Sequence, residues 1–193
     1  LLQALARFDC RLHGYVLMDN HVHLLVTPAG AGGVSRLMHT FSRNYAGLFN
    51  RRHGRTGTLW EGRYKACLVD SDGYFLACSR YIELNPVRAW IAAEPAEYAW
   101  SSYRANAVGV FDPLVSPHAC YLALGPDRRA REAAYRQLFD QALPASLVME
   151  IRQYLQQQKA LGSDRFRAWV ESRTGRFATA RPPGRPPRRS NCP

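Results

Sequence analysis

Two histidines separated by one residue, His21 and His23, are the first place in the sequence where side chains could hold a metal ion. Side chains at positions i and i+2 of a β-strand point to the same face. If residues 21–26 form a strand, the two imidazoles therefore offer neighbouring nitrogens to a divalent ion. Such a pair alone is more typical of a solvated strand face. The apolar residues 24–26 favour a metal site, because histidines beside a buried strand usually have a partner.

Residues 80–88 contain a tyrosine that could act as a nucleophile. The hydroxyl of Tyr81 can attack a phosphodiester if a cation lowers its pKa or polarises the phosphate. Asn85 lies four residues later and shares a helix face with Tyr81 if the helix extends that far. Pro86 disfavours helical backbone at the residue before it, so Asn85 could instead end the helix. A core tyrosine followed by a helix cap remains the alternative.

Aromatic and basic residues alternate within residues 57–65. Trp60 and Tyr64 could stack on unpaired bases, while Arg63 and Lys65 could bind phosphates, a combination suited to single-stranded nucleic acid. The same alternation also fits an ordinary edge strand, so this segment is weak support by itself.

The composition is that of a folded, strongly basic protein. Of the 193 residues, 47% are apolar, and the formal net charge is +11, which favours a polyanionic partner such as nucleic acid. No segment approaches the roughly 20 apolar residues that a membrane-spanning helix needs, so no membrane partner is expected. The five cysteines form no CxxC pair, which excludes zinc-ribbon and redox motifs and fits a reduced cytoplasm.

Strands and helices both follow from the spacing of apolar residues. A helix end is expected over residues 1–9 with its exit at 10–14, then strands at 15–18 and 21–26 joined as a hairpin by the turn at 19–20. Apolar periodicity predicts a helix at 34–53, and a third strand region is expected at 59–69. N-cap candidates at 70–72 and the limit set by Pro86 predict a further helix at about 71–84. After residue 112, helices are predicted at 128–142, at 147–161 and around 166–170. The Arg- and Pro-rich tail from residue 176 has no acid and is expected to be disordered.

Four blocks, at residues 14–26, 57–65, 81–88 and 100–103, resemble in sequence and order those of the single-tyrosine HUH transposases, which are IS200-like. The REP-associated tyrosine transposases are the most similar members, and the resemblance extends over about residues 1–175. It implies an α+β fold with a ferredoxin-like antiparallel sheet and helices on one face. It also implies that Leu1 is preceded in the family by a further strand, so that the catalytic domain is N-terminally incomplete.

The change of sequence pattern after about residue 112 and the composition from residue 176 divide the chain into a catalytic domain at 1–111, a helical C-terminal region at 112–175 and the tail at 176–193. Within the tail, residues 184–189 resemble an AT-hook for the DNA minor groove.

By match to the family's motifs, His21, His23 and Asn85 would hold Mg²⁺ or Mn²⁺, and Tyr81 would be the nucleophile. Asn85 stands where related transposases have Gln. Tyr74 and Tyr103 compete for the role of nucleophile. The proposed DNA contacts are the side chains of Trp60, Arg63, Tyr64, Lys65 and Arg88.

The implied activity is cleavage and rejoining of single-stranded DNA, at hairpin-forming repeats, through a 5′-phosphotyrosine intermediate. The implied setting is the bacterial cytoplasm, associated with the nucleoid, and the enzyme would act as a monomer or homodimer. The alternative is a non-catalytic descendant that binds structured single-stranded DNA or RNA.

Overall fold

The computed structural model describes residues 1–181 of the chain. Its centre is an antiparallel hairpin of β1 (Cys10–Leu17) and β2 (Val22–Pro28), closed by a turn in which the Met18 amide donates to the His21 carbonyl at 2.8 Å. The predicted hairpin is thus confirmed. The expected helix exit at residues 10–14 is wrong, because these residues belong to β1. The strand register shifts between Leu12 and Gly14, and this bulge breaks the alternation that would have marked the strand in the sequence.

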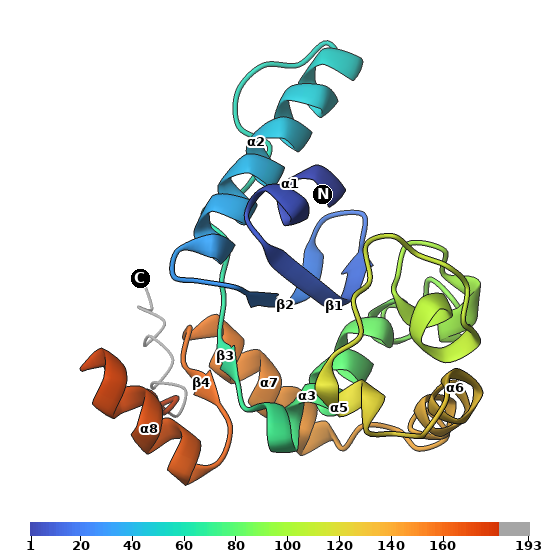
Figure 1. Cartoon of the computed structure of the whole chain (residues 1–193). Coiled ribbons are helices and arrows are strands. Elements are labelled where there is room, and N and C mark those ends of the chain that lie inside the picture. The colour runs from blue at the N-terminus through green and yellow to red at the C-terminus, as the bar shows by residue number, and fades with distance from the viewer. Residues whose placement is uncertain (182–193) are drawn as a thin grey trace, which may run out of the picture.

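One face of the hairpin packs against α1 (Leu2–Arg7) and α2 (Gly33–Arg52). The buried residues of this layer are Ala4, Leu5, Cys10, Leu12, Tyr15 and Leu37. The predicted helix at 34–53 is confirmed as α2. It ends before Gly54, whose positive φ of 60° suits a residue without a side chain. The outer end of α2 projects away from the hairpin (Figure 1).

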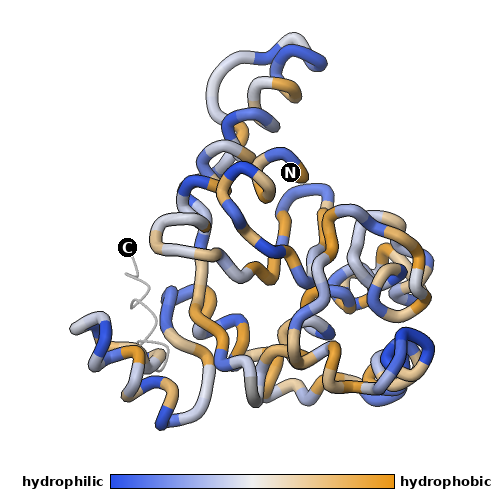
Figure 2. Tube along the Cα trace, in the orientation of Figure 1, coloured by the Kyte–Doolittle hydropathy of each residue, from blue (hydrophilic) through white to orange (hydrophobic). Residues whose placement is uncertain are grey.

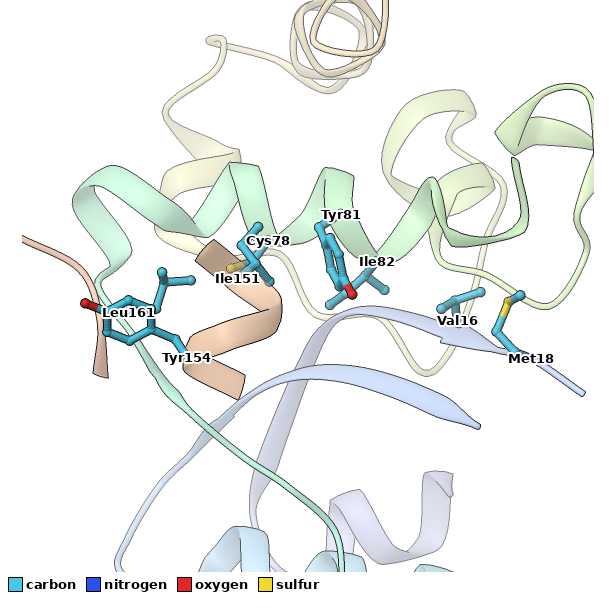
Figure 3. Packing of buried hydrophobic residues seen from close by; sticks show 8 residues of the cluster. All are labelled: Val16, Met18, Cys78, Tyr81, Ile82, Ile151, Tyr154 and Leu161. Carbon is cyan, nitrogen blue, oxygen red and sulfur yellow. The ribbon is translucent and has the colours of Figure 1, made fainter. Parts of the chain in front are cut away.

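The opposite face of the hairpin packs against α3 (Ser71–Glu83), and α7 (Ala145–Gln156) contributes side chains to the same buried cluster. The buried residues of this layer, labelled in Figure 3, are Val16, Met18, Cys78, Tyr81, Ile82, Ile151, Tyr154 and Leu161. Helices therefore cover both faces of the hairpin, which corrects the expectation of helices on one face. The α+β class is confirmed.

The third strand region predicted at 59–69 is wrong for most of its length. Only β3 (Leu68–Val69) is a strand, and it pairs in parallel with β4 (Ala160–Leu161) rather than with the hairpin. Residues 53–67 form an irregular connection whose side chains are mostly exposed, so no core fixes a strand there. Each sheet within residues 1–181 has two strands, and the ferredoxin-like sheet is not confirmed.

Residues 100–102 run along the outer edge of β1. The Leu17 amide donates to the Trp100 carbonyl at 2.9 Å, and the Ser102 amide donates to the Tyr15 carbonyl at 3.0 Å. These bonds satisfy the backbone groups that β2 leaves unpaired on β1.

The remaining elements are short helices and turns. They comprise α4 (Asn85–Arg88), the 3₁₀ turn η1 (Pro95–Glu97), the π-helical turn η2 (Arg104–Val108), α5 (Ala119–Leu122), α6 (Arg128–Gln137) and α8 (Asp164–Thr174). The three helices predicted after residue 112 correspond to α6, α7 and α8, while η2, α5 and β4 were not expected. None of the helices within residues 1–181 is long and apolar enough to span a membrane.

The first residues of the predicted disordered tail are ordered. Ala178 is buried and its carbonyl accepts from the Ala160 amide at 3.0 Å, while the backbone of Arg181 bonds to the side chain of Gln157. The expectation of disorder is therefore wrong for residues 176–181. The rest of the tail, with the AT-hook-like residues 184–189, lies outside the described residues.

Candidate active site

The two histidines lie side by side at the start of β2. Their ring centroids are 5.0 Å apart and the rings are nearly perpendicular, at 81°. His21, at the end of the turn, is exposed, and its Nδ1 lies 2.6 Å from Asn20 Oδ1. His23 is half-buried and lies opposite Val16 of β1. The i, i+2 spacing thus brings the imidazoles together as predicted.

Tyr81 reaches this pair from α3. Its ring centroid lies 5.7 Å from that of His23, and Figure 3 shows the ring pointing from α3 toward the hairpin. The residue is only 6% exposed, because Val16, Ile82 and their neighbours pack around it. The ring is therefore held in place by the core that α3 shares with the hairpin.

Arg88 of α4 folds back over the tyrosine. Its guanidinium carbon lies 4.3 Å from the Tyr81 ring centroid, and one of its terminal nitrogens donates to the Tyr81 carbonyl at 2.8 Å. The other two guanidinium nitrogens are buried without a hydrogen-bond partner among the described residues. Unpaired donors of a buried cation are costly, so they mark a position where an anion would be stabilised.

The electrostatic surroundings of His23 are basic. Burial, followed by the charges of His21, Arg88 and Arg152, lowers the pKa of His23 to about 4. The imidazole is consequently neutral at neutral pH and keeps a lone pair free for a metal ion. The same charges attract anions, and a phosphodiester is the anion that a nucleophilic tyrosine would need.

Asn85 opens α4 at its junction with α3. Leu84 is the C-terminal cap of α3 and also the N-terminal cap of α4. Pro86 occupies the first turn of α4, where its missing amide hydrogen removes no helical hydrogen bond. The chain thus continues helically past Tyr81 with a one-residue joint. The side-chain nitrogen of Asn85 is buried without a hydrogen-bond partner among the described residues.

By donor type, His21, His23 and Asn85 suit a divalent ion. The side-chain amide of Asn85 can turn by about 180° so that its oxygen takes the position of its unpaired nitrogen, because the two atoms have nearly the same size and geometry. Two imidazoles and an amide oxygen suit a divalent cation. A set of oxygen ligands alone would suit Mg²⁺ better. No group of three His, Cys, Asp or Glu residues within residues 1–181 could form a metal site, so the pair needs a donor of another kind.

Glu83, two residues after Tyr81, is fully buried. Its carboxyl accepts hydrogen bonds from Ser102 Oγ at 2.5 Å, Asn106 Nδ2 at 3.0 Å and the Tyr135 hydroxyl at 2.8 Å. Ser102 Oγ also accepts from the Tyr15 amide of β1 at 2.8 Å. Burial raises the pKa of Glu83 to about 7 against the opposing effect of these bonds. This network fixes the tyrosine helix to the strand that pairs with the histidine strand.

Two of these features were missed in the sequence. Glu83 had no pattern of its own, although the block at 100–103 contains its partner Ser102 and could have pointed to it. Arg152 lies on α7 and is exposed, yet its charge acts on His23. Its separation of about 130 residues from the histidines left no local pattern to find.

The expected DNA-binding residues divide between two places. Arg88 lies at the tyrosine, as described. The other four come from the connection between α2 and β3: Trp60 donates to the Ser42 carbonyl, Tyr64 bonds to Ser35, Lys65 donates to Gln156, and Arg63 is exposed. The bonds of Trp60 and Tyr64 thus lead to α2 and that of Lys65 leads to α7.

The competing tyrosines have other partners. Tyr74 donates to Glu150 at 3.3 Å, and burial raises its pKa. Tyr103 packs with Tyr135 and Phe139 in a different cluster. Tyr81 is the candidate whose ring contacts His23, which favours it as the nucleophile.

A histidine pair that meets a tyrosine beside an arginine combines the side-chain types that phosphodiester chemistry requires. Residues 1–85, which carry both histidines, Tyr81 and Asn85, match the family model described as IS200-like transposase. The match supports a relationship of this part of the chain to that transposase family. No curated protein and no solved structure is similar enough to this chain to match it.

Proposed function

We propose that this protein is a metal-dependent transposase of the IS200-like, REP-associated type, which cleaves and rejoins single-stranded DNA at hairpin-forming repeats. The observation that carries the proposal is the contact between the Tyr81 ring and His23, beneath Arg88, in the segment that matches the family. Tyrosine supplies a nucleophile that becomes covalently linked to DNA, and the basic surroundings suit its phosphate substrate.

His21, His23 and the amide of Asn85 would hold the Mg²⁺ or Mn²⁺ ion. When bound, such an ion polarises a phosphate oxygen and stabilises the charge that develops there. Arg88 would bind another phosphate oxygen through its unpaired nitrogens, and Arg152 adds positive charge from α7.

The Tyr81 hydroxyl would attack the phosphorus atom in line with the departing 3′ oxygen. A bond forms between the phenolic oxygen and phosphorus, and the bond from phosphorus to the 3′ oxygen breaks. The phenol loses its proton, and the departing oxygen takes one up as a 3′-hydroxyl. The resulting 5′-phosphotyrosine keeps the energy of the phosphodiester, so that another 3′-hydroxyl can reverse the step and join strands without ATP.

The Tyr81 residue as a whole is only 6% exposed, so local opening around the ring would make room for a phosphate at the hydroxyl. The joint at Leu84, between α3 and α4, is where a change of backbone angle would lift Arg88 from the ring. We propose that binding of the DNA phosphate, which offers Arg88 a better partner than the Tyr81 carbonyl, drives this local opening.

The test is an assay for a covalent adduct. Purified protein is incubated with an end-labelled single-stranded hairpin and Mn²⁺, and the adduct is resolved by denaturing electrophoresis. Tyr81→Phe is expected to abolish the adduct, whereas Tyr74→Phe, a matched change on the same helix, is expected to preserve it. An adduct with Tyr81→Phe would overturn the assignment of the nucleophile.

A second candidate function is a non-catalytic protein that binds structured single strands. The packing of the Tyr81 ring within the core favours it, because a structural role accounts for such a tyrosine without catalysis. Tight binding of the hairpin with no adduct and no cleaved strand, at any Mn²⁺ or Mg²⁺ concentration, would decide for this alternative.

A further inference from the structure

The outer half of α2 and the connection that returns to β3 form an arm, defined here as residues 41–67. Figure 1 shows this end of α2 projecting beyond the hairpin, with the connection running back beside it. Hydrophobic and hydrophilic residues alternate along the projecting end (Figure 2). The arm lies outside the buried clusters that hold the hairpin and α3.

A row of aromatic rings lies along the arm. Phe41, Tyr45, Phe49 and His53 recur at four-residue steps and therefore share one face of α2. Successive ring centroids are 6.3, 6.2 and 4.3 Å apart. Trp60 closes the row from the returning connection, 5.7 Å from Tyr45.

The row is open to solvent where it leaves the body of the protein. Tyr45 is 44% exposed, and its neighbour Leu48 is 56% exposed. A hollow of about 300 Å³ is lined here by Tyr45, Leu48, Phe49, Arg52 and His53. Aromatic faces in an open hollow with an arginine at its edge are arranged to take a flat, partly polar ring.

Positive charge surrounds these rings. Between residues 36 and 65 the sequence has seven Arg or Lys residues and one acid, Glu61. Arg51, Arg52 and Arg55 are exposed, and the Arg55 guanidinium lies 5.8 Å from the Phe49 ring centroid. A second copy of the chain would bring the same charges to the arm and be repelled, whereas a polyanion is attracted.

We propose that the arm is a second nucleic-acid site, apart from the active site, in which Tyr45, Phe49 and His53 stack with unpaired bases and the exposed arginines bind the flanking phosphates. Aromatic rows beside cations recognise single strands, because each base has a stacking face and the phosphates follow at regular intervals. The inference rests on the proposed function only in taking DNA as the nucleic acid, since the arm itself needs neither Tyr81 nor a metal ion.

Binding measured without catalysis tests the arm. The full chain is titrated into a labelled 12-nucleotide single strand and into a blunt duplex, without divalent ions, and fluorescence anisotropy is recorded. Tyr45→Leu, which keeps an apolar side chain but loses the ring, is expected to weaken single-strand binding about tenfold. Binding of the duplex should change less than twofold. Phe111→Leu, a matched loss of an exposed ring outside the arm, should change neither.

Arginine variants test the phosphate contacts separately. Arg51→Ala combined with Arg52→Ala should lower the slope of log Kd against log salt by about 1.4, whereas Tyr45→Leu should leave the slope unchanged. Wild-type affinity of Tyr45→Leu for the single strand would overturn the proposal. So would an arm variant that dissociates a dimer in sedimentation while DNA binding stays intact, since the arm would then bind a second copy.

The same samples separate this inference from the proposed function. Tyr74→Phe, outside both the arm and the proposed active site, should bind the single strand as tightly as the wild type. If no adduct forms with any protein but Tyr45→Leu still weakens binding, the arm stands and the catalytic proposal fails. If Tyr45→Leu forms adducts as well as the wild type at low DNA concentration, the catalytic proposal stands and the arm proposal fails.

Discussion

Arg88 combines two properties that normally exclude each other. Its guanidinium packs against the Tyr81 ring inside the protein, yet two of its nitrogens have no partner among the described residues. A buried cation without full hydrogen bonding lowers stability, so a stability requirement alone does not account for it. Binding of a phosphate does, because the anion would supply the missing acceptors.

Arg88→Met therefore separates stability from binding. The apolar side chain can pack on the Tyr81 ring without leaving donors unpaired, so the melting temperature should stay the same or rise. Affinity for the hairpin single strand should fall about tenfold or more, as measured by anisotropy. Arg165→Met, at an exposed position, should change neither quantity. A lower melting temperature with unchanged affinity would mean that Arg88 is only structural.

The neutral state of His23 leads to a prediction about the metal ion. Because its pKa is lowered to about 4, no proton competes for the imidazole at pH 7. Titration of Mn²⁺ in a calorimeter should give one site, and His23→Ala should weaken it at least tenfold. His39→Ala, an exposed histidine on α2, should leave the affinity unchanged. Equal affinity in both variants would remove His23 from the metal site.

At the scale of elements, the alignment of α3 with the hairpin depends on the carboxyl of Glu83. Ser102 connects it to β1, and Tyr135 connects it to α6. Four segments distant in sequence thus meet at a group two residues from Tyr81. Since β1 pairs with β2, the network determines how the tyrosine faces the histidines.

Glu83 should make stability depend on pH. The folded protein keeps this carboxyl protonated up to about pH 7, whereas an unfolded chain releases the proton near 4.5. The folded state binds more protons between these values, so the free energy of unfolding should fall by roughly 3 kcal/mol as pH rises through this window. Glu83→Gln, which never ionises, should lack this fall in urea unfolding measured from pH 4.5 to 8.

Comparison with the wild type isolates this effect. The lowered pKa of His23 contributes a slope of opposite sign in both proteins and cancels in the difference. Glu61→Gln, at an exposed carboxyl, should keep the wild-type slope. An identical slope in Glu83→Gln would show that the pKa of Glu83 is not raised.

At the scale of the molecule, the C-terminal helices complete the core beneath the candidate site. Ile151 and Tyr154 of α7 belong to the same buried cluster as Tyr81 and Val16. Residues 1–85 match the transposase family, but the tyrosine helix would lose its support without residues beyond 140.

Ile151→Ala should consequently affect both folding and catalysis. The cavity left by a buried isoleucine that is 3% exposed should lower the free energy of unfolding by about 2–5 kcal/mol. Adduct formation should fall with it at temperatures where the folded fraction drops. Met149→Ala on the same helix, at a residue 65% exposed, should cost no more than about 0.5 kcal/mol. A loss of unfolding free energy in Ile151→Ala as small as that expected for Met149→Ala would show that Ile151 is not part of the core.

The sequence by itself determined the features that depend on neighbouring residues. The i, i+2 spacing placed His21 and His23 on one face, and the turn at 19–20 joined β1 to β2. Apolar periodicity located α2, and the cap candidates at 70–72 together with Pro86 located α3. These follow from backbone geometry that repeats every two or 3.6 residues. Where local geometry was irregular, as at the bulge after Leu12, the prediction of β1 was too short.

Tertiary structure alone decided what depends on contacts distant in the chain. It paired β3 with β4 instead of the hairpin, placed helices on both faces, buried Glu83 and ordered residues 176–181. It also brought Arg152 to His23 and bonded Trp60 to the Ser42 carbonyl of α2. The physical reason is that burial and charge at a site sum over all neighbours in space, and sequence spacing encodes only the nearest of them.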